Sequence, residues 1–125
     1  MPQPHSIQQN PDVPFYAIIN PNSGPGAQPI DPSYQGCIPK LKAPNVNLVA
    51  YVATWFGDAT KSSGVIADIN TYASWDSSYV PDGIFFDQAS NNANDVALYT
   101  QYTTLAKQSF KGGAGVVSGI ALEYR

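Results

Sequence analysis

One acidic residue stands where a sheet protein could use it for chemistry. Asp87 directly follows the apolar run Ile84-Phe85-Phe86, which predicts a short buried strand with a carboxylate at its C-terminal end. In parallel α/β sheets, ligands bind and reactions occur at this end of the strands. A carboxylate is costly to bury without a partner, which favours a functional role for Asp87. The structural alternative is an aspartate that caps the following turn.

The residue after Asp87 restricts the chemistry that this position can support. Hydrolysis of a glycosidic bond generally requires one carboxyl group that protonates the leaving oxygen and another that acts as nucleophile or base. A second acid beside Asp87 would complete such a pair, but the next residue is Gln88. An amide cannot protonate a leaving group, although it can form hydrogen bonds with hydroxyl groups. The motif therefore predicts the position of a site rather than its reaction.

The elements that must position Asp87 follow from the hydrophobic pattern. Four largely continuous apolar runs, at residues 13–19, 46–53, 83–86 and 114–122, are typical of strands buried on both faces of a parallel sheet. Helical periodicity covers residues 65–73 and 99–110, and more weakly 34–41. The expected helix boundaries include capping serines at 62 and 63 and a stop at Gly112-Gly113.

This alternation predicts an α/β fold with about four βα units. It fits a doubly wound sheet, and its spacing also fits half of a (β/α)₈ TIM-type barrel. We expect residues 1–10 to form a disordered N-terminal stretch and residues 11–125 to form a single domain.

Polar and aromatic residues follow the first three strands and would meet at one edge of a parallel sheet. The Asn- and Gly-rich segment 20–26 lacks the Lys-Ser/Thr of a phosphate-binding loop, so it is either a tight turn or a ligand-contacting loop. Trp55 either packs on the next helix or offers a stacking surface to a sugar. The predicted ligand-contacting residues are Asn20, Asn22, Tyr51, Thr54, Trp55 and Gln88.

Composition excludes several other classes of protein. The net charge is −3 and the six Lys and Arg residues do not cluster, which argues against nucleic acid as a partner. With one cysteine and one histidine, we expect neither a metal site nor a cofactor. No run is long and apolar enough for a membrane span, and the N-terminus lacks the features of a signal peptide.

Taken together, several motifs resemble the spherulin-4 family (spherulation-specific family 4), which includes fungal cell-surface and secreted glycoside hydrolases. The resemblance covers roughly residues 10–112. The matching segments are Pro11-Asp12-Val13-Pro14-Phe15, Ile19-Asn20-Pro21-Asn22-Ser23-Gly24-Pro25-Gly26, Pro44-Asn45-Val46, Tyr51-Val52-Ala53-Thr54 and Asp82-Gly83-Ile84-Phe85-Phe86-Asp87. It implies a TIM-type barrel, an extracellular or cell-surface location, and activity on α-1,4-linked galactosamine-containing polysaccharide. Asp87 would then be the catalytic residue, with the acid supplied by Asp58, Asp82 or a residue outside this chain.

The chain departs from the family pattern in two respects. Gln88 occupies the position where the family typically has Glu, and losing a general acid costs about 10²–10⁴-fold in rate. A non-catalytic polysaccharide-binding protein is therefore the alternative to a hydrolase. The chain also resembles the middle of a barrel, so we expect a truncated domain whose exposed edge strands favour a homo-oligomer.

Overall fold

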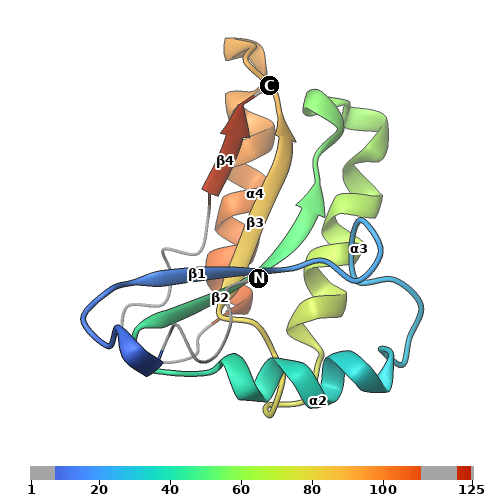
Figure 1. Ribbon diagram of the computed structural model, residues 1–125. Coiled ribbons are helices and arrows are strands. Elements are labelled where there is room, and N and C mark those ends of the chain that lie inside the picture. Colours follow the sequence, from blue (N-terminus) through green and yellow to red (C-terminus); the bar gives the residue numbers. More distant parts are fainter. Residues whose placement is uncertain (1–7, 111–120, 125) are drawn as a thin grey trace.

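A computed structural model describes residues 8–110 and 121–124, and the side chains of residues 8–110. Four parallel strands form one sheet: β1 (Phe15–Ile19), β2 (Val46–Ala53), β3 (Gly83–Ala89) and β4 (Ala121–Tyr124), in the order β1-β2-β3-β4 (Figure 1). The predicted α/β class with a parallel sheet is thus confirmed. β4 includes the last part of the fourth apolar run, whereas residues 114–120 lie outside the described part of the chain.

Three helices connect the strands: α2 (Pro32–Leu41), α3 (Ser62–Ala73) and α4 (Val96–Ser109). The N-cap of α2 is Asp31, whose Oδ1 accepts a hydrogen bond from the Ser33 amide at 2.8 Å, and Pro32 suits the first helical position. The prediction that Ser62 and Ser63 cap α3 is wrong, because α3 begins at Ser62 and follows directly on a 3₁₀ turn. The predicted stop at residues 112–113 lies outside the described residues, and α4 ends at Ser109.

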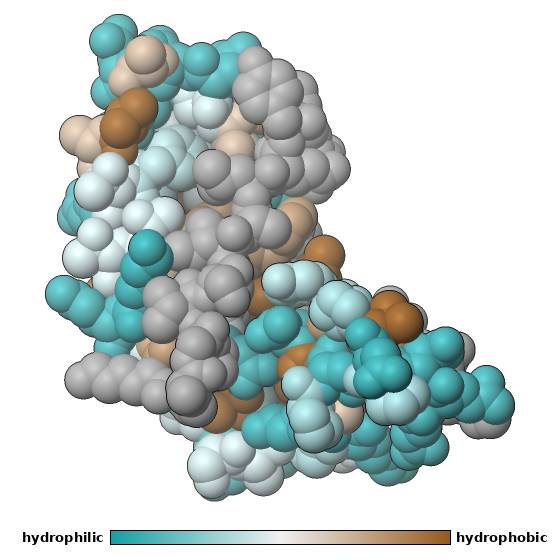
Figure 2. All heavy atoms as spheres, turned by 90° about the vertical axis from the view of Figure 1, so that its left-hand side faces the viewer, coloured by the Kyte–Doolittle hydropathy of each residue, from teal (hydrophilic) through white to brown (hydrophobic). Residues whose placement is uncertain are grey.

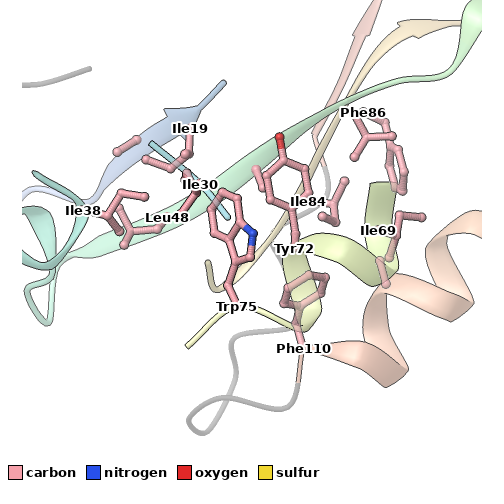
Figure 3. Packing of buried hydrophobic residues seen from close by; sticks show 14 of the residues in the cluster. Ile19, Ile30, Ile38, Leu48, Ile69, Tyr72, Trp75, Ile84, Phe86 and Phe110 are labelled. Carbon is pink, nitrogen blue, oxygen red and sulfur yellow. The ribbon is translucent and has the colours of Figure 1, made fainter. Parts of the chain in front are cut away.

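The hydrophobic core lies between the three helices and one face of the sheet. Strand residues that point to this face are paired in the parallel register, such as Leu48 with Ala17 and Phe86 with Val52. Side chains from all three helices pack against them (Figure 3). The largest fully buried side chains in this core are Tyr72, Tyr102, Phe86, Ile19, Ile38, Leu48, Ile69 and Ile84.

The opposite face of the sheet has a different character on β1. Tyr16 and Ile18 are 56% and 40% exposed, so the expectation that every strand is buried on both faces is wrong for β1. The physical reason is that the helices described here pack on the core face alone. Figure 2 shows hydrophobic side chains on one side of the molecule as separate patches among hydrophilic ones.

Parallel pairing brings the C-terminal ends of β1, β2 and β3 to one edge of the sheet. Tyr51 and Asp87 lie in the same side-chain register, since Tyr51 pairs with Phe85 and Ala53 with Asp87. Because side chains alternate along a strand, both point to the face opposite the helices. Within the described residues, no helix is long and apolar enough to cross a membrane.

Candidate functional site

The end of β3 is a bulge rather than a regular strand end. The pairing register between β3 and β4 shifts between Phe86 and Ala89, and Gln88 has a φ of 55°. A positive φ is uncommon for residues other than glycine, and bulges are frequent next to active sites, where they redirect side chains. Asp87 and Gln88, the two residues that the sequence singled out, therefore form the bulge.

Asp87 is buried, with 2% of its surface exposed. The Tyr51 hydroxyl on β2 donates a hydrogen bond of 2.5 Å to its Oδ2. The following 3₁₀ turn (Ala93–Asp95) is capped by Asn92, which weakens the alternative that Asp87 is a turn cap. The buried Asp87 carboxylate thus lies beside a half-buried tyrosine, and Tyr51 is the more exposed of the two residues.

Thr54 holds this strand end in place from the neighbouring strand. It is fully buried, and its Oγ1 lies 2.9 Å from the carbonyl oxygens of Asp87 and Gln88 and 2.6 Å from the Tyr99 hydroxyl. The Thr54 amide donates to the Asp87 carbonyl as well, at 3.0 Å. Thr54 therefore fixes the shape of the bulge, and the hydroxyl of Tyr99, which the sequence did not single out, belongs to the same network.

The loop after β1 is organised by its own side chains. Asn20 Oδ1 accepts a hydrogen bond of 3.1 Å from the Gly24 amide, and the Asn22 amide donates to the Gly24 carbonyl at 3.1 Å. Gly24 has a φ of 144°, and a Cβ there would lie 3.1 Å from Asp68 Oδ2. These bonds favour the tight turn over a purely ligand-contacting loop, although Asn20 and Asn22 are both exposed at the site edge.

Trp55 and Phe56 follow β2 in an unusual conformation. Both have a φ of 54°, a left-handed geometry that costs on the order of 1–3 kcal/mol per residue. They are 48% and 54% exposed, and the Lys61 ammonium lies 5.0 Å from the centre of the Trp55 ring. The structure thus favours the exposed aromatic surface over packing on the next helix.

The two carboxylates named as possible proton donors are placed unfavourably for that role. Asp82 precedes β3, at the sheet edge opposite Asp87, and accepts a hydrogen bond from the Leu48 amide at 2.9 Å. Asp58 follows β2 and lies near the same edge of the sheet as Asp87, but hydrogen bonds from the Thr60 side chain and amide lower its pKa. A lowered pKa keeps Asp58 ionised, so it is a poor general acid.

Asp68 on α3 is a partly buried carboxylate that was not among the residues predicted from the sequence. Burial raises its pKa above the ordinary 3.8. One turn further along α3, the Tyr72 hydroxyl donates to the Tyr51 carbonyl at 2.8 Å, and burial together with the Asp68 charge raises the pKa of Tyr72. The clue in the sequence is an acid four residues before a tyrosine on the apolar face of the predicted helix.

We expect Asp68→Asn to change how stability depends on pH. A carboxyl whose pKa is raised by folding contributes most stability below its unfolded value of 3.8 and loses that contribution as pH rises through the folded value. The free energy of unfolding of the variant should therefore rise relative to wild type across this window. Denaturant unfolding from pH 3 to 8 measures the difference, and curves that stay parallel would contradict the expectation.

Asp76→Asn is the matched control for this experiment. Asp76 is fully exposed, and hydrogen bonds from the Ser78 amide and side chain lower its pKa. Its contribution is present above 3.8 and disappears as pH falls, so the two variants should deviate from wild type with opposite signs.

A cavity of about 260 Å³ lies beside the end of β3, between this strand and α4. Its walls include Ser90, Asp95 and Tyr99, and Ser90 Oγ donates to Asp95 Oδ2 at 2.5 Å. None of the predicted site residues lines this cavity. Among residues 8–110, no group of three or more His, Cys, Asp or Glu side chains is arranged to hold a metal ion.

Comparison with known proteins finds similarity to one family model, one curated protein and one crystal structure. The family described as spherulation-specific family 4 matches residues 2–119. Spherulin-4 from Physarum polycephalum is 46% identical over 88 residues, which are 70% of this chain and 26% of that protein. A crystal structure of Aspergillus clavatus Sph3 in complex with GalNAc is 34% identical, with a TM-score of 0.76, over 94% of this chain and 49% of that chain. The chain therefore spans about a quarter to a half of these relatives.

Proposed function

Because this chain belongs to spherulation-specific family 4, we propose that it binds galactosamine-containing polysaccharide at the edge of the sheet where β1, β2 and β3 end. The similar Sph3 structure was determined in complex with GalNAc, which supports an amino sugar as the recognised unit. The site would be built from Asp87, Gln88 and Tyr51, with Asn20 and Asn22 around it, Thr54 as a brace and Trp55 at its outer edge.

The observation that carries this proposal is the buried Asp87 carboxylate at the bulged end of β3. Its Oδ2 accepts the Tyr51 hydroxyl bond, and the strand end is locked by Thr54. A strained strand end that holds a buried carboxylate is typical of functional sites. Asp87 would orient Tyr51 and present negative charge to the sugar.

The barrel is part of the same proposal. In the described residues, the helices pack on one face of the sheet while Tyr51 and Asp87 point to the other. A doubly wound sheet would have helices on both faces, whereas in a (β/α)₈ barrel the helices form an outer ring around the strands. We infer that the four βα units form part of such a barrel, with Asp87 on its inner side.

Two versions of the activity are consistent with glycoside-hydrolase ancestry. In the first, Asp87 acts as nucleophile, base or charge stabiliser in hydrolysis and another group supplies the proton. In the second, the chain binds polysaccharide without cleaving it. Gln88 favours the second, since its amide cannot protonate a leaving group and both Asp58 and Asp82 are engaged elsewhere. An extracellular or cell-surface location, and self-association through exposed edge strands, complete the proposal.

Binding to a galactosamine-containing polysaccharide tests this function. Asp87→Asn should weaken binding by about 10–100-fold, the range that corresponds to a lost hydrogen bond to a charged group. Asp76→Asn makes the same change of charge on an exposed residue that follows α3, at the opposite edge of the sheet, and should bind like wild type. If wild type and Asp87→Asn bind equally, Asp87 is not part of the site.

A further inference from the structure

Residues 54–58 form a closed turn that presents two aromatic side chains outward. The Gly57 amide donates to the Thr54 carbonyl at 3.1 Å, and the Asp58 amide donates to the Trp55 carbonyl at 3.0 Å. Trp55, Phe56 and Gly57 all have a positive φ, of 54°, 54° and 81°. A positive φ is unstrained for Gly57 but strains the backbone of Trp55 and Phe56. Such strain persists only where the surrounding structure enforces it.

The surroundings that enforce it are the end of β3 and the segment that follows this strand. Gly57 packs so closely on the Asp95 carboxylate that a Cβ would overlap it. Thr54, the first residue of the turn, is bonded to the Asp87 and Gln88 carbonyls. The backbone that carries the two rings is thus held in part by the Thr54 hydrogen bonds that also hold the end of β3.

The rings themselves are left to solvent. Trp55 and Phe56 are 48% and 54% exposed, although burying them would be favourable. Lys61 lies over the Trp55 ring at 5.0 Å, a contact that orders the indole and can cover only one of its faces. A rigid, half-exposed aromatic pair is suited to stacking on the flat apolar face of a sugar ring.

We propose that Trp55 and Phe56 form an aromatic ledge that binds a second sugar unit of the polysaccharide, next to the unit held at Asp87. The inference rests on the proposed function and adds to it a requirement for chain length. A polymer contacts both Asp87 and the ledge, whereas a single amino sugar contacts the Asp87 site alone. The ledge also adds Phe56 to the residues that contact the polysaccharide.

Tryptophan fluorescence reports on the ledge without any substitution. The chain has two tryptophans, and Trp75 is buried at 7% exposure, so quenching by acrylamide reports mainly on Trp55. We expect galactosamine-containing polysaccharide to protect this emission from quenching and saturating GalNAc to leave it unprotected. Protection that grows with protein concentration in the absence of sugar would identify a protein contact instead and would overturn the ledge.

Substitutions test the ledge separately from the proposed binding at Asp87. Phe56→Ala should weaken polysaccharide binding by about tenfold and leave GalNAc binding unchanged. Tyr16→Ala, which removes an exposed aromatic ring on β1, should change neither. If Phe56→Ala binds the polymer as wild type does and Trp55 stays unprotected, the ledge is overturned while binding at Asp87 stands. If wild type binds neither ligand, the proposed function is overturned and the ledge with it.

Discussion

Replacing Gln88 by glutamate is expected to raise hydrolysis of galactosamine-containing polysaccharide by about 10²–10⁴-fold over wild type, the usual contribution of a general acid. The substitution restores the two-carboxyl arrangement that glycoside hydrolysis requires. The position suits an acid, because Gln88 Oε1 is buried and has no hydrogen-bond partner among the described residues. A glutamate at the same place would be shifted toward its protonated form by burial, which is the form that donates a proton.

Release of reducing ends from the polysaccharide measures this gain. The double variant Asp87→Asn with Gln88→Glu is the matched control, since it keeps the new acid and removes the partner carboxylate, and it should lose the activity again. A folded Gln88→Glu protein that binds polysaccharide and does not cleave it would show that Gln88 is not in the position of the missing acid. Wild-type activity equal to that of the variant would show that this chain needs no second acid there.

The largest expected effect on stability comes from Thr54→Val. The substitution keeps the shape of the side chain and removes the hydroxyl that lies between the carbonyls of Asp87 and Gln88 and the hydroxyl of Tyr99. A buried hydrogen bond contributes about 0.5–1.5 kcal/mol to stability, and the substitution removes those of the Thr54 hydroxyl while the Asp87 carbonyl keeps its bond from the Thr54 amide. We therefore expect the free energy of unfolding to fall by at least this amount, and binding at the strand end to weaken with it.

Denaturant unfolding at neutral pH measures the loss. Thr100→Val is the matched control, because Thr100 is exposed and, among residues 8–110, its hydroxyl bonds only to the Val96 carbonyl in its own helix. Surface substitutions of this kind usually stay within about 0.5 kcal/mol of wild type. Equal stability of the two variants would mean that the Thr54 network does not hold the bulge.

The sheet was predictable because its strands are strongly apolar and separated by helical patterns. β2 has the predicted bounds, Val46–Ala53. β3 extends beyond the predicted residues 83–86 to Ala89, so Asp87 lies within the strand near its C-terminal end rather than directly after it. The bulge at Gln88 was not predictable, since glutamine carries no preference for a positive φ and the geometry is imposed by contacts from Thr54 and Tyr99.

The surroundings of the site were the feature that the sequence predicted least well. Asp82 and Asp87 flank the same run of residues, and only the direction of β3 shows that they lie at opposite edges of the sheet. Asp68 has the pattern of a polar residue on an amphipathic helix. Its position beside Gly24, where an added Cβ would lie 3.1 Å from Asp68 Oδ2, depends on how the loop after β1 folds over α3. The exposure of Trp55 and Phe56 depends on backbone strain that propensities do not encode.

The most direct test of the central claim is an NMR titration of the isotope-labelled chain with GalNAc, following backbone amide shifts. A site at the C-terminal edge of the sheet predicts that the shift changes gather at residues 20–24, 51–54 and 87–90. Shift changes that gather instead at residues 42–46 and 76–83, at the opposite edge, would contradict the account.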